Sequence, residues 1–494
     1  ERNVKERLTD YFNKYTATAK ISTPKLDSFD INYNRKTIAI YASESFAYQP
    51  FRPETVKSIY NQVKELLPGP VHYYQLTIYA DGKPIEDLVP NFYRNKKKDK
   101  ERLSLNVDYK GVPWVKNISR PNEISRGLQD RHIAIWQSHG NYFKNDKNEW
   151  GWQRPRLFCT TEDMFTQSFV LPYVIPMLEN AGAIVYTPRE RDTQKNEIIV
   201  DNDTPNTSLY LEVGSKKANW TNAPVRGFAQ KKTIYKDGEN PFTDGTCRFI
   251  PTERKKKKNK DQVFAEWVPT LPATGKYAVY VSYQTLPNSV SDAKYLVFHN
   301  GGVTEFKVNQ KIGGGTWVYL GTFEFDKGNN DYGMVVLSNE SSEQGVVCAD
   351  AVRFGGGMGN IARGGKTSGL PRYLEGARYS AQWAGMPYEV YAGRKGENDY
   401  TDDINTRSNA INYLSGSSVY NPQQSGLGVP LEMTMALHSD AGCSKIDEFI
   451  GSLGIYTTDF NNGKLNTGTD RYASRDLADI LLTQIQKDIY SSYR

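Results

Sequence analysis

The sequence has few of the residues that usually mark a redox centre or a membrane anchor. Its 494 residues include four cysteines. None of them forms a C-x-x-C pair, which argues against a zinc ribbon or a thioredoxin-like site. Four cysteines allow three disulfide pairings, and their spacing does not choose among them. No stretch approaches the ~20 consecutive apolar residues that a membrane-spanning helix needs, so we expect no membrane span.

A secretory leader and a strong charge bias are also missing. No hydrophobic signal region begins at Glu1, which indicates either a cytosolic chain or one whose signal peptide has been removed. The 33 tyrosines and 8 tryptophans suit a sugar-facing surface, so we expect a secreted, periplasmic or cell-surface location. The net charge is only +6, and two basic clusters contribute much of it, Lys96–Lys98 with Lys100 and Arg254–Lys258 with Lys260. We expect these clusters to be solvated loops, with no nucleic acid as partner.

The pattern of apolar, polar and turn-forming residues changes along the chain, and it predicts an α/β protein with an all-β insertion. Residues 1–128 have the pattern of a small N-terminal α/β unit. Residues 203–358 lose helical periodicity and carry short β-prone runs between Gly, Asn and Pro, which is typical of a sandwich or jelly roll. Residues 129–202 and 359–494 alternate strands and helices. We expect these two segments to form one mixed sheet with flanking helices, interrupted by the sandwich.

Two stretches far apart in the sequence have the same design. In Arg131–Asn141 (R-H-I-A-I-W-Q-S-H-G-N) an apolar strand ends shortly before His139, and in Leu431–Gly442 (L-E-M-T-M-A-L-H-S-D-A-G) another ends at His438. Ligands and metals gather at the carboxyl edge of the strands in open α/β sheets. We therefore predict that the two histidines lie side by side in one sheet. The Trp- and Asn-rich loop 141–156 that follows the first strand is long enough to be functional.

Glu162 is the third residue of interest, because it begins a helical pattern that continues to Gly182. An acidic residue in a first helical turn is ordinarily explained by the helix dipole. A catalytic zinc ion, however, needs three protein ligands and one open position, and His and Glu both serve. We therefore predict Zn²⁺ as cofactor, with His139, Glu162 and His438 as metal ligands. Such an ion makes hydroxide available for attack on an amide or ester carbonyl.

These motifs resemble the zinc-dependent N-acetylmuramoyl-L-alanine amidases, which have strand-G-H-G, a helix-opening Glu, T-R-x-x-D and strand-H-x-N/D-A. The resemblance implies the same three zinc ligands, and it places Arg189 and Asp440 at substrate-binding positions. It also implies cleavage of the bond between the lactyl group and L-alanine in peptidoglycan. The family has a catalytic glutamate on a later strand, and no glutamate in a matching context precedes Arg494. We expect either a C-terminal fragment that completes the amidase domain or a lost base, and the catalytic residue stays unknown.

The inserted segment resembles a second family. Gly315–Phe325 (G-T-W-V-Y-L-G-T-F-E-F) and Val346–Phe354 (V-V-C-A-D-A-V-R-F) are similar to the golvesin C-terminal-like β-sandwich, which accompanies Bacteroidetes proteins often labelled xanthan lyase-like. Aromatic side chains of this segment are candidates for stacking on sugar rings, or else they form the sandwich core. The candidates are Trp267, Trp317 and Tyr319.

Three functions remain open at this stage. The first is a zinc amidase acting on peptidoglycan or a related envelope glycopeptide. The second is a non-catalytic cell-surface protein that binds glycan on an amidase-like scaffold. The third is a polysaccharide lyase of the xanthan type, which needs a proton-abstracting group near a uronate. Bound zinc separates the first from the third, and turnover separates the first from the second.

Overall fold

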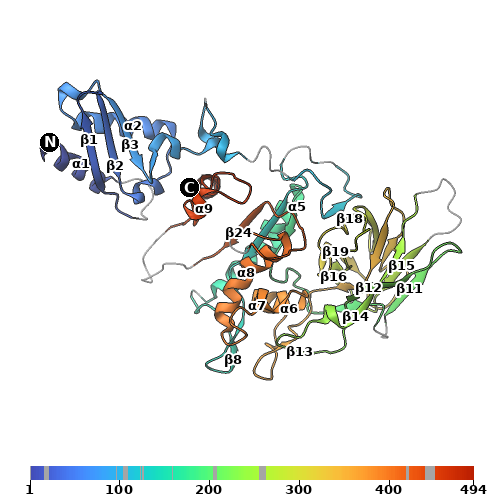
Figure 1. Ribbon diagram of the computed structural model, residues 1–494. Helices are drawn as coiled ribbons and strands as arrows, with labels where there is room; N and C mark the ends of the chain where they lie inside the picture. The colour runs from blue at the N-terminus through green and yellow to red at the C-terminus, as the bar shows by residue number, and fades with distance from the viewer. Residues whose placement is uncertain are drawn as a thin grey trace. The chain divides into compact units, whose positions relative to one another are not determined.

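The computed structural model describes residues 1–494 except 1, 16–21, 96, 104–108, 123, 125–126, 158, 204–207, 255–262, 419–421, 440–450 and 494. The chain divides into two compact units (Figure 1). Unit 1 comprises Glu1–Asp108 together with Gly442–Arg494, and unit 2 comprises Tyr109–Ala441. Among the described residues, no helix combines the length and the apolar character that crossing a bilayer requires.

Unit 1 contains a four-stranded sheet in the order β1-β2-β3-β4, in which β2 and β3 are parallel and the other pairs antiparallel. Alternation along β2 buries Ile38 and Ile40 against helices α1 and α2, which contribute Leu8 and Ile59 to the same core. The bounds are α1 Arg2–Lys14, β1 Leu26–Asn32, β2 Thr37–Ala42, α2 Pro53–Leu66, β3 Gln75–Ala80 and β4 Lys83–Pro84.

The final helix of the chain, α10 (Tyr472–Ser492), belongs to unit 1 as well. Tyr472 joins the core of this unit, and the buried Arg475 donates hydrogen bonds to three backbone carbonyls of the N-terminal part. The short turn α9 (Phe460–Gly463) precedes it. Helix α10 lies in the segment 359–494, in which alternating strands and helices are expected. Its place in unit 1 differs from the predicted division, which assigned all of 359–494 to the α/β domain that holds the histidines.

The β-rich part of unit 2 consists of a six-stranded sheet, β11-β15-β20-β17-β18-β5, a four-stranded sheet, β10-β22-β16-β19, and a three-stranded sheet, β12-β14-β21. The strands β5 and β10 lie outside the predicted range 203–358 but pair with strands inside it. The bounds are β5 Val115–Asn117, β10 Ile198–Val200, β11 Leu209–Val213, β12 Thr221–Gly227, β14 Gly245–Pro251, β15 Phe264–Val268, β16 Gly275–Val281, β17 Ala293–His299, β18 Gly302–Val308, β19 Val318–Phe325, β20 Met334–Ser338, β21 Val346–Ala349 and β22 Val352–Phe354.

The rest of unit 2 is built around a three-stranded parallel sheet in the order β24-β6-β9. Its helices α6, α7 and α8 share one hydrophobic core with the sandwich strands, so the inserted strands and the helices beside them in Figure 1 form one body. The bounds are β6 His132–Gln137, β7 Tyr142–Lys144, β8 Glu149–Gly151, β9 Ile184–Tyr186, β13 Tyr235–Lys236, β23 Ile361–Ala362, α6 Ala377–Trp383, α7 Tyr388–Tyr391, α8 Asp399–Ser415 and β24 Met433–Leu437.

The helical segment that begins at Glu162 is not the single long helix that its pattern predicts. It consists of α3 (Glu162–Phe165), α4 (Gln167–Phe169), a wide π turn and α5 (Ile175–Asn180). Pro172 and Pro176 lie in its second half and have no backbone N–H to donate, so regular helical bonding is interrupted there.

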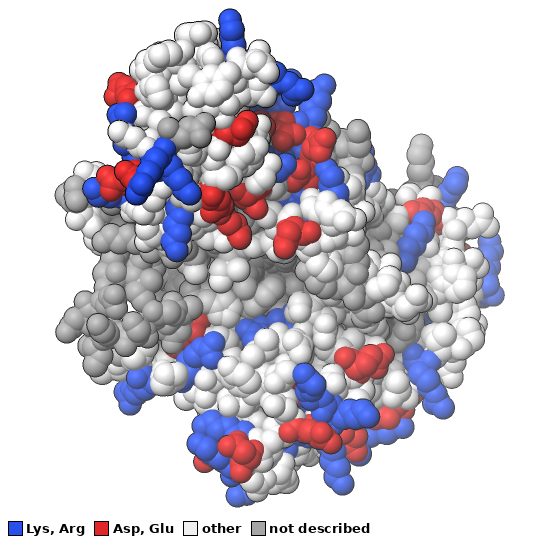
Figure 2. Space-filling view, turned by 60° about the vertical axis from the view of Figure 1, so that its left-hand side comes forward, with Lys and Arg blue, Asp and Glu red and all other residues white. Residues whose placement is uncertain are grey.

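Figure 2 shows the distribution of charge on one face of the molecule. On the face drawn in Figure 2, lysine and arginine side chains alternate with aspartate and glutamate, and neither sign forms a continuous field. The second predicted basic cluster lies mostly outside the described residues. Of the cysteines, Cys159 is an exposed thiol and Cys247 and Cys348 are buried thiols, while Cys443 lies outside the described residues.

Candidate metal centre

The two histidine-bearing strands are neighbours in the parallel sheet of unit 2. Trp136 pairs with Ala436, and Gln137 pairs with Leu437. Because the strands are parallel and in register, both leave the sheet at the same edge, where His139 and the residue after Leu437 follow. The imidazole centroids of His139 and His438 lie 4.9 Å apart. The predicted juxtaposition of the two histidines is confirmed.

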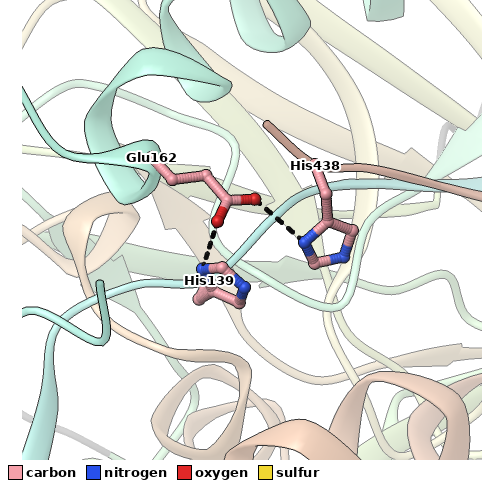
Figure 3. Close-up of side chains that lie close together, drawn as sticks. All are labelled: His139, Glu162 and His438. Carbon is pink, nitrogen blue, oxygen red and sulfur yellow. Dashed lines mark hydrogen bonds and ion pairs between the residues drawn. The ribbon is translucent and has the colours of Figure 1, made fainter. Parts of the chain in front are cut away.

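The carboxylate of Glu162 lies between these imidazoles, as Figure 3 shows. Its Oε1 atom is 3.0 Å from Nδ1 of His438 and accepts a hydrogen bond from the backbone N–H of Ser439. Its Oε2 atom is 3.6 Å from Nδ1 of His139. The Glu162 side chain is only 1% exposed, whereas that of His438 is 36% exposed, so the group is open to solvent at His438.

The donor set and its surroundings fit a divalent metal ion. Both ring nitrogens of His139 are buried and make no hydrogen bond within the described residues. Burial lowers the pKa of His139 to about 3, so its imidazole is neutral, which is the form that binds metal. One ligand atom from each of His139, Glu162 and His438 lies within 4.8 Å of the others. Zinc binds such atoms at about 2.0–2.2 Å, so the three side chains would draw closer together around one ion. That these residues bind zinc stays a prediction.

The loop that carries His139 is fixed by buried hydrogen bonds. Ser138 shares a hydroxyl hydrogen bond with Thr166 at 2.6 Å, and its carbonyl accepts one from Arg407 at 3.0 Å. Gly140 packs directly on the backbone of Glu375, where a Cβ would meet the carbonyl carbon and oxygen at 2.4 Å. Only glycine fits this close approach without a backbone shift.

Arg189 does not have the exposure that a substrate-binding residue requires. It is 2% exposed, and its guanidinium donates to the backbone carbonyls of Gln137, His139, Tyr373 and Glu375. Burial lowers the pKa of Arg189 to about 10. The amidase resemblance implies that Arg189 contacts substrate, and the structure corrects this expectation. Arg189 instead positions the backbone around His139. The other implied substrate contact, Asp440, lies outside the described residues.

A second carboxylate is close to the group but is already engaged. Oδ1 of Asp163 lies 3.9 Å from Nδ1 of His139, and its two oxygens accept hydrogen bonds from the backbone N–H groups of Gln153 and Arg154. Asp163 is fully buried, so it holds the preceding loop against the helix. Within the described part of the chain, the group of potential ligands contains no second glutamate.

Arg154 is a site residue that sequence reasoning missed. Its Nε atom lies 3.4 Å from Oε2 of Glu162, and its Nη1 atom donates to the hydroxyl of Tyr400 at 3.3 Å. The only sequence signal for it was the long Trp- and Asn-rich loop 141–156, in which this arginine is one of many polar residues.

The predicted sugar-stacking residues are mainly part of the core. Trp267 is 1% exposed and donates its indole N–H to the carbonyl of Asp350, so its faces are not available to a sugar. Trp317 is 8% exposed and donates to the carbonyl of Trp383. Tyr319 is half-buried, and its ring is covered by the guanidinium of Arg191 at 3.8 Å. The alternative that these aromatic residues pack within the protein therefore describes them better.

Comparison with known proteins identifies the sandwich. Residues 248–356 match the family model of the Golvesin C-terminal domain, which confirms the predicted resemblance for this segment. The chain is 38% identical over 110 residues to a xanthan lyase of Bacillus sp. (strain GL1). That alignment covers 22% of this chain and 11% of the relative, so the chain spans about a tenth of the relative's length.

Two solved structures share local similarity with this chain. A xanthan lyase of Paenibacillus is 25% identical over 32% of this chain and 13% of its own, with a TM-score of 0.23. The K1 cleaved adhesin domain of Lys-gingipain from Porphyromonas gingivalis W83 is 14% identical over 32% of this chain and 97% of its own, with a TM-score of 0.19. These TM-scores are too low for a shared overall fold.

Proposed function

We propose that this protein acts on a glycan-containing polymer of the cell envelope or its surroundings, with a zinc ion held by His139, Glu162 and His438. The observation that carries this proposal is the meeting of the three side chains at one sheet edge, where the buried ring nitrogens of His139 have no hydrogen-bond partner among the residues that the structure describes. The glycan part is supported by the Golvesin C-terminal match and by the similarity to a xanthan lyase. A location outside the cytoplasm follows from such a substrate.

Hydrolysis is the activity that the donor set favours. A zinc ion with three protein ligands lowers the pKa of a bound water to about 7 and so supplies hydroxide at neutral pH. His139, Glu162 and His438 would hold the ion, and the exposed side chain of His438 makes the group accessible to solvent. The amidase resemblance would make the lactyl–L-alanine amide of peptidoglycan the bond that is cleaved, whereas the comparisons support a glycan-related function without specifying this bond. The general base is not identified among the described residues.

A glycan-binding protein without turnover is the second candidate. It is favoured by the family match of the sandwich and by the engagement of Asp163, the nearby carboxylate, in hydrogen bonds to the backbone. On this alternative the metal ion stabilises the loops that follow the sheet strands. The protein then binds its polymer without cleaving it.

A polysaccharide lyase is the third candidate, because the curated relative is named a xanthan lyase. The similarity extends over 110 residues, whereas Glu162 and His438 are 276 residues apart. One such segment cannot include both ligands, so it carries no information about the group as a whole. The sandwich is the simpler explanation of this similarity.

Metal content is the first test. The chain is purified without chelators, and bound metals are measured by mass spectrometry in the wild type, in a His139→Ala/His438→Ala double variant and in His299→Ala as control. His299 lies on β17 and hydrogen-bonds to Asn300 and Thr304, away from the group. About one zinc per chain, lost in the double variant alone, is the expected result. Metal-free protein that takes up no added zinc contradicts the proposal.

Turnover then separates the three candidates. Zinc-loaded protein is incubated with purified peptidoglycan and with xanthan, and the products are analysed by mass spectrometry. Free stem peptides beginning with L-alanine indicate the amidase, and unsaturated uronates indicate the lyase. Co-sedimentation with a polymer and no new product indicates the binding protein.

A further inference from the structure

The sheet of unit 1 has one face that the proposed function does not use. Helices α1 and α2 pack on the other face, where Ile38, Ile40 and Ile78 are buried in the core of this unit. Because side chains alternate along a strand, the intervening residues point away from the helices. We call these residues the open face of unit 1. They are Ser28, Asp30 and Asn32 on β1, Thr37, Ala39 and Tyr41 on β2, and Gln75, Thr77 and Tyr79 on β3.

Two stacked tyrosines lie at one end of the open face. Tyr41 and Tyr79 are paired on the parallel strands β2 and β3. Their ring centroids lie 5.0 Å apart, with 14° between the ring planes. This separation is about one strand spacing, so the rings face each other across the two strands. The inner ring faces therefore cover each other, and each ring has an outer face that is directed along the sheet.

The outer face of Tyr41 lies beside a short side chain. Ser28 of β1 is directly opposite Tyr41, and a hydroxymethyl group is too short to cover a phenol ring. Tyr41 is accordingly 42% exposed, although β2 is an inner strand of the sheet. An open aromatic face of this kind is a surface on which the C–H groups of a sugar ring can stack.

Small and polar side chains continue from the ring along the strands. Ala39 follows Tyr41 on the open face, and it lies between Asp30 of β1 and Thr77 of β3. Carboxylate and hydroxyl groups bind the hydroxyls of sugars. From Tyr41 to Thr37 the face extends for about 13 Å, which is longer than one sugar ring. A chain of several sugars therefore fits it better than a single sugar does.

The charge and composition of the open face discriminate among partners. Among the described residues that form it, Asp30 is the charged one and no lysine or arginine occurs, so it repels nucleic acids and other polyanions. The core of a protein–protein interface is rich in large apolar side chains, whereas most positions here are small or polar. An uncharged sugar chain has both the hydroxyl groups and the C–H faces that these residues match.

We propose that the open face of unit 1 binds an uncharged, extended strand of β-1,4-linked sugars, with one sugar ring stacked on the outer face of Tyr41. This site is a second contact with the polymer, beyond the proposed function, and it does not need the metal ion. Because both contacts belong to one chain, polymer held at the first is at a raised effective concentration for the second.

The test measures binding of hexasaccharides to the full chain by isothermal titration calorimetry. Cellohexaose and hexa-N-acetylchitohexaose are uncharged, extended and β-1,4-linked, whereas maltohexaose is α-1,4-linked and coiled. We expect at least one of the first two to bind about tenfold or more tightly than maltohexaose. The better of the two indicates the backbone of the polymer. Binding of neither, or equally tight binding of maltohexaose, overturns the inference.

Two variants assign the binding to the open face. Tyr41→Thr removes the ring and keeps a β-branched residue in the strand. Ser28→Ile keeps the ring and covers its outer face with a side chain that pairs well with an aromatic neighbour, so it decides the question even where Tyr41→Thr fails to fold. Each should weaken binding about tenfold or more. Binding that persists in Ser28→Ile, or in folded Tyr41→Thr, overturns the inference.

The control variant is Phe92→Thr. Phe92 is an aromatic residue of unit 1 that is 69% exposed and lies outside the sheet, in the short turn Asn91–Tyr93. It should bind the hexasaccharides like the wild type. The oligomeric state of each variant is measured by analytical ultracentrifugation. A wild-type dimer that becomes a monomer in Tyr41→Thr identifies a second copy of the chain as the occupant of the open face and overturns the inference.

The His139→Ala/His438→Ala variant separates this inference from the proposed function. It should bind the hexasaccharides as the wild type does, because the open face uses neither histidine. Wild-type chain without zinc contradicts the proposed function, while its hexasaccharide binding still decides the open face. Binding that is lost in the double histidine variant and retained in Tyr41→Thr places the sugars at the metal centre and overturns the inference.

Discussion

The Nη1 atom of Arg189 lies 2.6 Å from the carbonyl oxygen of His139. A buried cation therefore holds the backbone of a candidate metal ligand by a direct hydrogen bond, while in the described part of the chain no group hydrogen-bonds to that ligand's ring nitrogens. The loop geometry and the donor set of the site are thus supplied by different residues, and they can be tested separately.

Replacement of Arg189 tests whether its hydrogen bonds hold the loop of His139 in place. In Arg189→Lys an ammonium cannot reach the four carbonyls that the guanidinium serves, so some of them lose their hydrogen bonds. We expect the free energy of unfolding to fall by about 2–4 kcal/mol, measured by urea denaturation. Zinc affinity should fall about 10–100-fold, as for other residues that orient metal ligands. Arg226→Lys, an exposed control, should change neither quantity.

The close approach at Gly140 gives a second prediction. In Gly140→Ala the new methyl group meets backbone atoms of Glu375 at 2.4 Å, and backbone atoms cannot move aside as a flexible side chain can. We expect a loss of stability of about 2 kcal/mol or more and a weaker zinc site. Gly69→Ala, where no atom lies within 4 Å of the added group, is the control. Equal stability and equal zinc content of the two variants would show that the loop has no need of glycine.

Glu375 gives a prediction about pH. Its carboxyl is buried, Oε1 accepts a hydrogen bond from Ser368, and burial raises its pKa from 4.5 to about 7. The unfolded chain loses this proton near 4.5 and the folded chain near 7, so the free energy of unfolding falls as pH rises through that window. Glu375→Gln removes this contribution.

The measurement for Glu375→Gln is urea denaturation from about pH 4 to about pH 8. Relative to the wild type, the variant should gain up to about 3 kcal/mol at the upper end of this range. The exposed Glu324→Gln serves as control. A stability difference between Glu375→Gln and the wild type that does not change with pH would mean that Glu375 is ionised in the folded protein.

Replacement of Arg475 tests whether the C-terminal helix and the N-terminal segment form one unit. Its guanidinium donates to the carbonyls of Leu88, Ala47 and Gln49, so Arg475→Leu leaves three buried acceptors unpaired. We expect about 3–5 kcal/mol of local destabilisation. Hydrogen exchange should become faster in α10 and in residues 22–95 together, with unit 2 unchanged. Lys487→Leu on the same helix is the control, and faster exchange confined to α10 would contradict the assignment.

Local patterns predicted much of the candidate site. The apolar run before His139, the one before His438 and the helix start at Glu162 are short-range signals, and the structure has β6, β24 and α3 at these places. Ligand-type residues gather at the carboxyl edge of the strands in open α/β sheets, so the juxtaposition of the two histidines could be inferred as well.

Residues whose role depends on distant contacts could not be assigned. Arg189 binds carbonyls 50 and 186 residues away, and no local pattern distinguishes such an arginine from one that faces substrate. The strand containing Trp267 alternates between two faces, and only the opposing sheet decides which face is interior. The alternating pattern of 359–494 predicted helices in this segment but could not show that the partners of α10 lie in the first hundred residues.

The pairing of β10 with β22 has a consequence for how the metal centre is assembled. Ile198 lies opposite Phe354, so the chain enters and leaves the sandwich at adjacent points. Ribosomes add about 5–20 residues per second, so His438 appears roughly 14–55 s after Glu162, when all strands of the sandwich have already been made. Once folded, the sandwich shortens the flexible chain between the two candidate ligands. The entropic cost of bringing Glu162 and His438 together then falls by somewhat less than about 1 kcal/mol. The inserted domain then helps to bring Glu162 and His438 together, so the candidate metal centre is completed late, after most of the chain has been made.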